Sequence, residues 1–264
     1  MNSTTYQTIE LQRDGHAALV ILNRPEARNA FNEITIAEIT QAFREISADT
    51  SIRAVVLAAR GPAFCAGADL NWMRKMADFT QEENRADAAQ LAQMLRVIYE
   101  CPQPVVARVQ GDCYAGGMGL MAACDIAVTV GEANFCLSEV KLGLIPATIS
   151  PYVIRAMGEN AARRYFLTAE RFTAEEALRI GLVQEVVALH ALDATVTAIV
   201  KSLVGNSPNA VRQAKRLVRE VGGKSISSIL IADTVESIAQ IRASEEGREG
   251  VSAFLEKRKP SWLG

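Results

Sequence analysis

Histidine and paired cysteines are both scarce in this sequence of 264 residues. The only histidines are His16, in an apolar strand-like run, and His190, near an expected helix start. Two histidines disfavour a zinc site and a Ser-His-Asp hydrolase, and the motifs HExxH and GxSxG do not occur. The five cysteines are odd in number and form no CxxC pair, so we interpret them as reduced packing residues. Chemistry carried by carboxylates and backbone amides is therefore favoured.

Long apolar runs and a strong net charge are also missing. The runs 17–22 and 54–59 are far shorter than the roughly 20 residues that span a bilayer. The first ten residues lack the basic and apolar regions of a signal peptide, so we expect a cytoplasmic protein. Lys and Arg number 28 against 30 Asp and Glu, a net charge of −2 that offers no basic field for nucleic acid or anionic lipid.

The pattern of apolar residues predicts alternating β and α elements over the first 190 residues. Apolar runs at 8–11 and 17–22 around an Asp-Gly turn predict a β-hairpin, and Thr-x-x-Glu capping boxes begin helices after Thr80 and Thr173. The further expected elements are a helix over 33–46, buried strands at 54–59 and 105–109, a last strand at 183–187, and a helix that Gly181 ends.

Beyond residue 189 the pattern is almost purely helical. The expected helices cover 189–204, 208–221, 226–243 and 245–257. Their apolar faces must be buried somewhere, which favours packing on a neighbouring subunit. We therefore expect an α/β fold with a core over residues 1–190 that holds the site, and a helical oligomerisation region over residues 191–264.

Two glycine-rich loops, at 64–70 and 110–119, follow buried strands. Small residues let a ligand approach the backbone closely, and unpaired amides at a helix N-terminus favour negative charge. If the two loops converge they form an oxyanion hole; each loop alone is explained equally well as a tight packing turn. The spacing Gly117-x-Gly119-x-x-Ala122 matches a dinucleotide fingerprint, but it does not follow its strand directly, which disfavours nicotinamide or flavin binding.

Glu139 stands in an apolar segment just after an expected strand. Partial burial there would raise the pKa of its carboxyl group and suit general acid–base catalysis. Taken alone, a helix cap or an ion pair with Lys141 is the more common role for such a glutamate.

Five motifs follow one another along the whole chain: NRPEARNAF from Asn23, FCAGADL from Phe64, YAGGMGLMAACD from Tyr114, SEVKLGLIP from Ser138 and AFLEKRKPSW from Ala253. Together they resemble the enoyl-CoA hydratase/isomerase family, also called the crotonase superfamily. Residues 138–158 and the segment RRYFLTAERF are especially similar to bacterial 3-methylglutaconyl-CoA hydratases of leucine degradation. They also fit the isohexenylglutaconyl-CoA hydratases of acyclic terpene degradation.

The resemblance implies a spiral of ββα units whose C-terminal helices build trimers, usually paired into hexamers. By motif position, the amides of Ala68 and Gly116 would form the oxyanion hole for the thioester oxygen. Asp69 and Asp125 would be structural hydrogen-bonding residues. Coenzyme A would arrive as part of the substrate, with no metal or redox cofactor. The residues implied for its binding are Ala27, Arg28, Ala66 and, from a neighbouring subunit, Lys257.

Family hydratases usually place two glutamates beside the water that adds. Glu139 matches the second, whereas the first position holds Gly119. We expect a hydratase in which Glu139 both orients the water and supplies the C2 proton. A single carboxylate is also the pattern of family isomerases, and a non-catalytic acyl-CoA-binding protein is a further alternative. RNA binding, attached to one relative of the family, has little support at this net charge.

The acyl group that such a site would accept is indicated only by neighbouring residues. Trp72, Met73 and Met76 have a helix-like spacing that suits either an acyl pocket or the core. A carboxylated substrate requires a counter-charge, for which the sequence offers three candidates. These are Arg74, Lys75 and Arg155.

Overall fold

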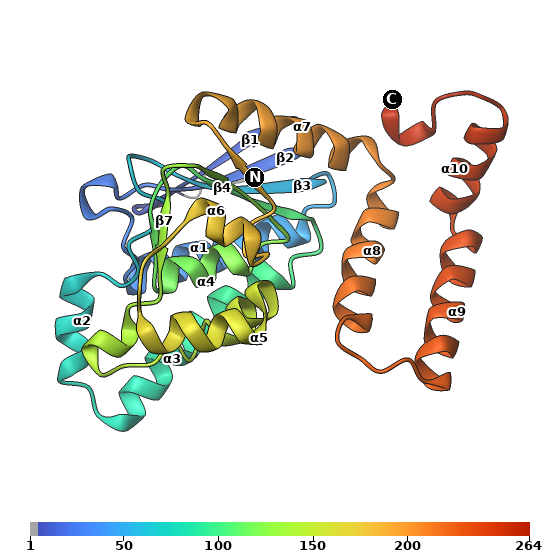
Figure 1. Cartoon of the computed structure of the whole chain (residues 1–264). Coiled ribbons are helices and arrows are strands. Elements are labelled where there is room, and N and C mark those ends of the chain that lie inside the picture. Colours follow the sequence, from blue (N-terminus) through green and yellow to red (C-terminus); the bar gives the residue numbers. More distant parts are fainter. Residues whose placement is uncertain (1–4) are drawn as a thin grey trace.

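A six-stranded sheet with the order β1-β2-β3-β4-β6-β9 forms the centre of the protein in a computed structural model, which describes residues 5–264 (Figure 1). Only β1 and β2 are antiparallel, and every other neighbouring pair runs parallel. Most strands are almost wholly apolar because helices cover both faces of the sheet. Its strands are β1 (Ile9–Asp14), β2 (Ala17–Leu22), β3 (Ala54–Ala59), β4 (Val105–Val109), β6 (Ile126–Val130) and β9 (Glu185–Val187).

The predicted hairpin is present, but its first strand is longer than expected and runs to Asp14. Asp14 pairs with Ala17, so Gly15 and His16 alone form the turn, and Gly15 has a φ of 56°. The strand-like placement of His16 was therefore wrong: this residue lies exposed in the turn. The polar residues 12–14 looked like a loop because they belong to an edge strand that faces solvent.

A second sheet of three short strands lies beside the first, in the order β5-β7-β8. It consists of β5 (Cys113–Tyr114), β7 (Asn134–Cys136) and β8 (Phe172–Thr173). The strand expected before Glu139 is thus confirmed as β7. Because β5 leads into α4 (Gly116–Ala122), this small sheet carries the second glycine-rich loop.

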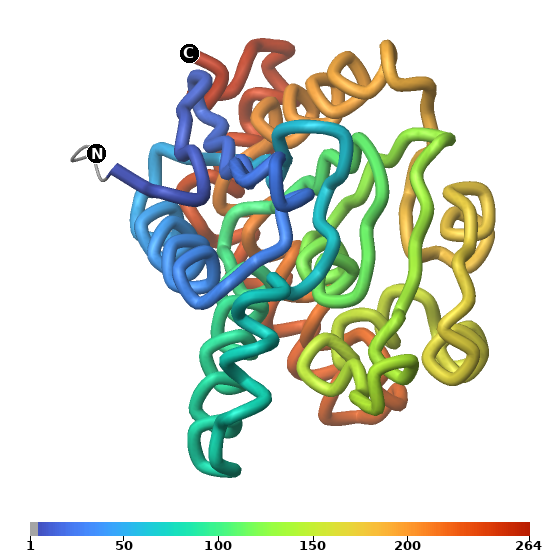
Figure 2. The backbone as a smooth tube through the Cα atoms, turned by 90° about the vertical axis from the view of Figure 1, so that its left-hand side faces the viewer, coloured from blue at the N-terminus to red at the C-terminus, as the bar shows by residue number. Residues whose placement is uncertain are grey.

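Helices α1 (Glu33–Ala48) and α3 (Gln81–Tyr99) pack together beneath the sheet in Figure 1. The Thr80 capping box is confirmed, and α6 (Ala174–Arg179) begins at the predicted Thr173 cap. The sequence did not predict α5 (Ser150–Thr168), whose course is broken at Gly158 (φ 79°). Helix α2 (Leu70–Ala77) leads into α3, and the two project from the body as a hairpin (Figure 2).

The C-terminal region is helical, as predicted. Helix α7 (Leu192–Gly205) follows a short 3-10 turn and packs on β3, β4 and β6. Helices α8 (Pro208–Val221), α9 (Ser228–Ala243) and α10 (Glu245–Leu255) form an arm beside the body, named the arm below (Figure 1). No helix within residues 5–264 is long and apolar enough to cross a membrane.

Three cations of α8 attach the arm to the body. Lys215 is buried, and its Nζ lies 2.6 Å from Oδ2 of Asp125 and 3.0 Å from the carbonyl oxygen of Gln103. Arg212 and Arg219 donate to the carbonyl oxygens of Thr50, Ile52 and Tyr99. Asp125 also accepts the N–H of Val105, in agreement with the structural role expected for it.

Candidate functional site

The two glycine-rich loops meet backbone to backbone. Cys65 and Cys113 form an isolated parallel bridge, in which the N–H of Tyr114 donates to the carbonyl oxygen of Cys65 (2.9 Å). A Cβ atom added to Gly67 would lie 3.0 Å from Cβ of Ala115 and 3.6 Å from the amide nitrogen of Gly116. The convergence that an oxyanion hole requires is therefore present in the fold.

The amides of Ala68 and Gly116 have no hydrogen-bond acceptor within residues 5–264. Phe31 pairs with Gly67 oxygen and Asp69 nitrogen, at 2.9 and 3.0 Å, so the N–H of Ala68 points away from Phe31. Gly116 is the first residue of α4, and amides in the first turn of a helix lack an intrahelical acceptor. Two such donors beside each other can stabilise an oxygen that develops negative charge.

The residue before Gly116 has an unusual backbone conformation. Ala115 has φ 46° and ψ −122°, which costs an alanine on the order of 1–3 kcal/mol. Gly116 itself cannot carry a side chain, because its Cβ would lie 2.3 Å from Cζ of Phe31. This strain was missed from the sequence, since nothing in the residue type of Ala115 indicates a positive φ.

Glu139 begins the 3-10 helix η2 (Glu139–Leu142), three residues after the end of β7. Burial raises the pKa of its carboxyl group, and the Oε2 atom is inaccessible and has no hydrogen-bond partner among residues 5–264. No ion pair joins it to Lys141 in the described part of the chain, and Ser138 occupies the position before the helix. The two structural roles considered for Glu139, a helix cap and an ion pair with Lys141, are therefore not realised.

The small sheet connects the segments that lead to Gly116 and to Glu139. Cys136 of β7 pairs with Tyr114 of β5, and the N–H of Ala115 donates to the carbonyl oxygen of Cys136 (2.8 Å). Because β5 and β7 are parallel, both strands end on the same side of this sheet. One strand leads to the Gly116 amide and the other to the Glu139 carboxyl group.

Gly119 lies against Ile149, which is 2% exposed. A Cβ atom at Gly119 would lie 2.2 Å from Cγ2 and 2.7 Å from Cβ of Ile149. Ile149 therefore fills the space that a side chain at position 119 would need. A second glutamate cannot be placed there without a shift of the isoleucine.

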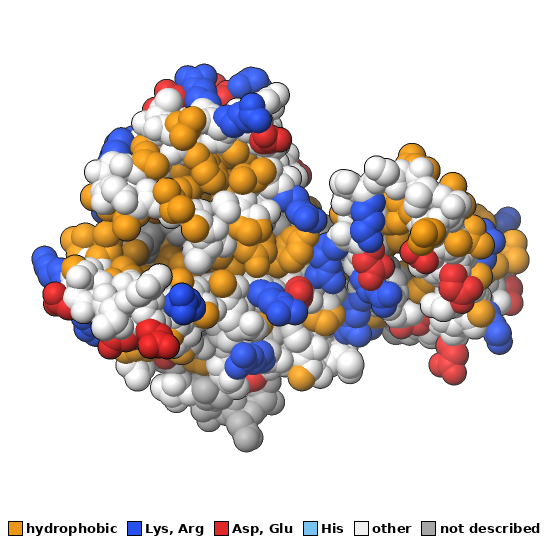
Figure 3. All heavy atoms as spheres, turned by 90° about the horizontal axis from the view of Figure 1, so that it is seen from below, with side chains coloured by type: hydrophobic (Ala, Val, Ile, Leu, Met, Phe, Trp, Pro, Cys, Tyr) orange, Lys and Arg blue, Asp and Glu red, His pale blue; other side chains and the backbone are white. Residues whose placement is uncertain are grey.

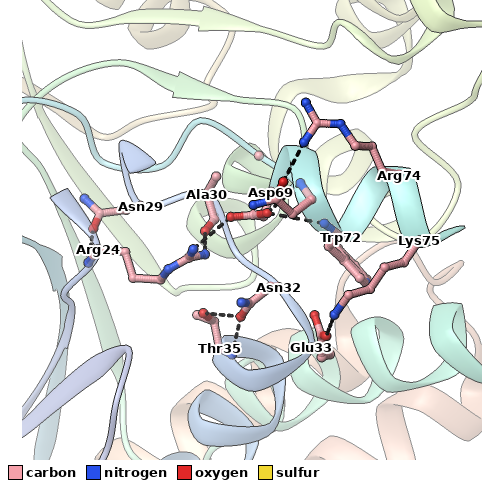
Figure 4. A network of polar contacts seen from close by, with 12 residues as sticks. Arg24, Asn29, Ala30, Asn32, Glu33, Thr35, Asp69, Trp72, Arg74 and Lys75 are labelled. Carbon is pink, nitrogen blue, oxygen red and sulfur yellow. Dashed lines mark hydrogen bonds and ion pairs between the residues drawn. The ribbon is translucent and has the colours of Figure 1, made fainter. Parts of the chain in front are cut away.

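Asp69 fixes the segment that carries the Ala68 amide (Figure 4). Its carboxylate caps α2 by accepting the N–H groups of Asn71 and Trp72, and it pairs with Nη2 of Arg24 at 2.8 Å. Arg24 also donates to the carbonyl oxygen of Ala30 (2.6 Å). The structural role expected for Asp69 is thus present.

The residues implied for coenzyme A binding are brought together only in part. The N–H of Ala66 donates to the carbonyl oxygen of Arg28 (3.0 Å), which places both residues and Ala27 beside the first loop. The side chain of Arg28 is exposed. Lys257 follows α10 in the arm, and no hydrogen bond joins it to Arg28 within residues 5–264.

The candidate counter-charges differ in their partners. Lys75 pairs with Glu33 at 2.6 Å, and Arg74 donates to Oδ1 of Asn71 (Figure 4). Arg155 of α5 donates to the hydroxyl of Tyr99 and lines a cavity of about 1070 Å³ between the body and α8.

The residues considered for an acyl pocket divide between core and surface. Trp72 is buried, and its Nε1 donates to Asp87 of α3, which ties α2 to α3. Met76 packs against the core, whereas Met73 is half-buried. Trp72 and Met76 therefore belong to the core, and of the three residues only Met73 is left as a candidate for an acyl pocket.

Comparisons with known proteins agree on one family. The family described as "Enoyl-CoA hydratase/isomerase" matches residues 13–264. An enoyl-CoA hydratase structure from Shewanella pealeana is 43% identical with a TM-score of 0.94, over 97% of this chain and 96% of that chain. The short-chain-enoyl-CoA hydratase of Clostridium acetobutylicum is 33% identical, over 94% of this chain and 95% of its own length. The mevalonyl-coenzyme A hydratase of Aspergillus fumigatus is 34% identical, over 94% and 91%.

Proposed function

The chain belongs to the enoyl-CoA hydratase/isomerase family, with its crotonase fold and its enoyl-CoA hydratase activity, and on that premise we propose a specific reaction for it. Its substrate is a 3-methyl-branched enoyl-CoA whose acyl chain ends in a carboxylate, such as 3-methylglutaconyl-CoA or isohexenylglutaconyl-CoA. Water adds reversibly across the 2,3 double bond. This reaction would serve leucine or acyclic terpene degradation in the cytoplasm.

The mechanism uses the two free amides and one carboxylate. The N–H groups of Ala68 and Gly116 bind the thioester oxygen, which becomes enolate-like as the water oxygen bonds to C3. The Glu139 carboxylate accepts a proton from that water and returns a proton to C2, so that the net addition is one water molecule. The observation that carries this proposal is the Glu139 carboxyl group, whose pKa burial raises and whose Oε2 atom has no hydrogen-bond partner among residues 5–264, so no structural role accounts for that oxygen.

The branched substrate is supported by two observations. Residues 138–158, which contain Glu139, and the segment RRYFLTAERF resemble 3-methylglutaconyl-CoA hydratases. The relative from Aspergillus fumigatus is named for mevalonyl-coenzyme A, an acyl group that also carries a methyl branch at C3. For the distal carboxylate, Arg74 and Arg155 are the candidate counter-charges, because Lys75 is already paired with Glu33.

An enoyl-CoA isomerase is the second candidate, and the contact between Gly119 and Ile149 favours it. An isomerase needs one group that moves a proton between C2 and C4, which Glu139 alone can do. A non-catalytic acyl-CoA-binding protein is disfavoured, because such a protein has no use for a buried carboxyl group without a partner.

We also propose that the chain works as a homotrimer, alone or paired into a hexamer. The body of residues 1–190 would carry the acyl-CoA site, and residues 191–264 would build the trimer. The arm exposes Ile229, Val235, Phe254 and Leu255, and Figure 3 shows apolar side chains both on the arm and on the body. A neighbouring subunit that covers these surfaces would also bring Lys257 to the site.

The test follows the loss of the conjugated enoyl-thioester absorbance with 3-methylglutaconyl-CoA, beside crotonyl-CoA as an unbranched substrate. We expect faster loss with the branched substrate, and a fall of about 10²–10⁴-fold in kcat for Glu139→Gln. Glu132→Gln, an exposed glutamate on the same segment, is the matched control. Conversion of a β,γ-enoyl-CoA without water uptake would instead establish the isomerase. Light scattering of the purified chain decides between monomer and trimer.

A further inference from the structure

Asp112 joins three segments that surround the candidate oxyanion hole. Its backbone carbonyl oxygen accepts the N–H groups of Phe64 and Cys65 in the first glycine-rich loop, at 3.0 and 3.3 Å. Its carboxylate accepts the hydroxyl of Tyr114 at 2.8 Å, within the second loop. The same carboxylate accepts the backbone N–H and the side-chain amide of Asn134, at 3.0 and 3.2 Å, at the start of β7.

These bonds surround the strained residue Ala115. A non-glycine residue keeps a conformation such as φ 46°, ψ −122° only where the surrounding structure holds it on several sides. Tyr114 precedes Ala115 and is held by Asp112, while the N–H of Ala115 is held by Cys136 of β7. Asp112 thus fixes both the residue before Ala115 and the strand that receives its N–H.

We propose that Asp112 is a positioning residue, which aims the Gly116 N–H at the substrate carbonyl oxygen by holding Tyr114 and Asn134 around the strained Ala115. The inference rests on the proposed function, because it assigns a thioester oxygen to that amide. Asp112 does not touch the substrate: it acts through Ala115.

The charges around Asp112 suit this role. Burial would raise the pKa of the Asp112 carboxyl, but its hydrogen bonds with Tyr114 and Asn134 and the nearby Arg171 lower it. Burial and the Asp112 carboxylate raise the pKa of Tyr114 to about 12, so its hydroxyl remains a donor at neutral pH. The guanidinium of Arg171 lies 5.4 Å from the centre of the Tyr114 ring and holds the ring from another side.

The experiment measures the carbonyl group of the bound substrate in the full-length protein. Infrared difference spectra are recorded with crotonyl-CoA that carries ¹³C at the thioester carbonyl, together with kcat, KM and the unfolding midpoint. With wild-type protein, the bound carbonyl stretch moves to lower wavenumber than in free crotonyl-CoA, because the two N–H groups polarise it. In Asp112→Ala we expect most of this shift to disappear. We also expect kcat to fall by about 10–10²-fold, which is less than the roughly 10²–10³-fold loss of a whole oxyanion donor, while KM changes by less than about threefold.

Two further variants separate positioning from plain stability. Asp112→Asn retains an acceptor for Asn134 and should restore part of the carbonyl shift and of kcat. Asp49→Asn replaces a hydrogen-bonded carboxylate at the end of α1. This variant should leave the carbonyl shift intact, even where it lowers the unfolding midpoint. If Asp112→Ala does not fold, Tyr114→Phe removes one bond of the same set and should still reduce the shift.

A wild-type carbonyl shift in Asp112→Ala, or in Tyr114→Phe where the former does not fold, overturns the inference. The absence of a shift in wild-type protein with every enoyl-CoA tried overturns the proposed function itself. The two failures are therefore distinguishable in a single set of spectra.

Discussion

Replacing Gly119 with alanine tests the contact between this residue and Ile149. The new Cβ would lie 2.2 Å from Cγ2 of Ile149, and overpacking of this kind costs about 1–3 kcal/mol. Alanine inside a helix gains about 1 kcal/mol over glycine, so Gly119→Ala should destabilise the protein by about 0–2 kcal/mol. The cost of Gly119→Ala should be smaller in a protein that also carries Ile149→Ala, since that change removes Cγ2, the atom that makes the closest contact.

In the Ile149→Ala background, the remaining contact is the Cβ atom of residue 149 at 2.7 Å, and the emptied space allows a local shift. Ile149→Ala alone should cost about 2–5 kcal/mol because it leaves a cavity. We expect the free-energy cost of Gly119→Ala to be at least about 1 kcal/mol smaller in this background than in wild-type protein.

Urea unfolding at one fixed protein concentration measures the four free energies of this cycle. Gly131→Ala is the control, since a Cβ there meets no atom of residues 5–264 within 4 Å and its effect should be the same in both backgrounds. An equal cost of Gly119→Ala in both backgrounds, within about 0.3 kcal/mol, would refute the contact.

Three further predictions concern single charged groups. Burial raises the folded-state pKa of Glu139, so ionisation of this carboxyl group lowers the stability of the folded protein as the pH rises. Glu139→Gln should therefore raise the thermal midpoint near pH 8 and leave it almost unchanged near pH 4. Lys215→Met leaves the Asp125 carboxylate without its cation and should cost about 3 kcal/mol in urea unfolding. Arg24→Met removes the partner of Asp69 and should cost about 1.5–3 kcal/mol, with a fall in kcat because Ala68 is less firmly placed.

Each of these predictions has a control variant or an outcome that contradicts it. Glu132→Gln is exposed and should not change the pH dependence of the midpoint. Arg96→Met breaks an exposed pair with Glu100 and should cost less than about 0.5 kcal/mol, so an equal loss for Lys215→Met would contradict the anchoring role. An unchanged kcat in Arg24→Met would show that the Arg24–Asp69 pair serves stability alone.

Local signals in the sequence predicted much of the fold. The capping box at Thr80 and the uniformly apolar run 54–59 depend only on neighbouring residues, and both were placed correctly. Helix α5 was missed because its apolar residues are irregularly spaced and Gly158 interrupts it. Strands β5 and β8 have two residues each, which is too short to show any alternation.

The candidate site was predictable in its parts but not in its geometry. The glycine-rich loops and Glu139 could be named from the sequence, because they fall in ordered motifs that resemble those of the family. The conformation of Ala115, the Asp112 contacts and the filling of the space at Gly119 by Ile149 depend on residues that are distant in sequence. Only the folded chain brings them together.

The parallel bridges at the site also have a consequence for refolding. Phe31 pairs with Ala68 and Cys65 pairs with Cys113, so each donor is oriented by a bond between segments far apart along the chain. Contacts of this kind form slowly, because a long loop must close before they are gained. After dilution from denaturant, the far-ultraviolet circular dichroism of the helices should therefore return before enzymatic turnover does. Recovery of turnover then indicates that the bridges between distant segments have formed.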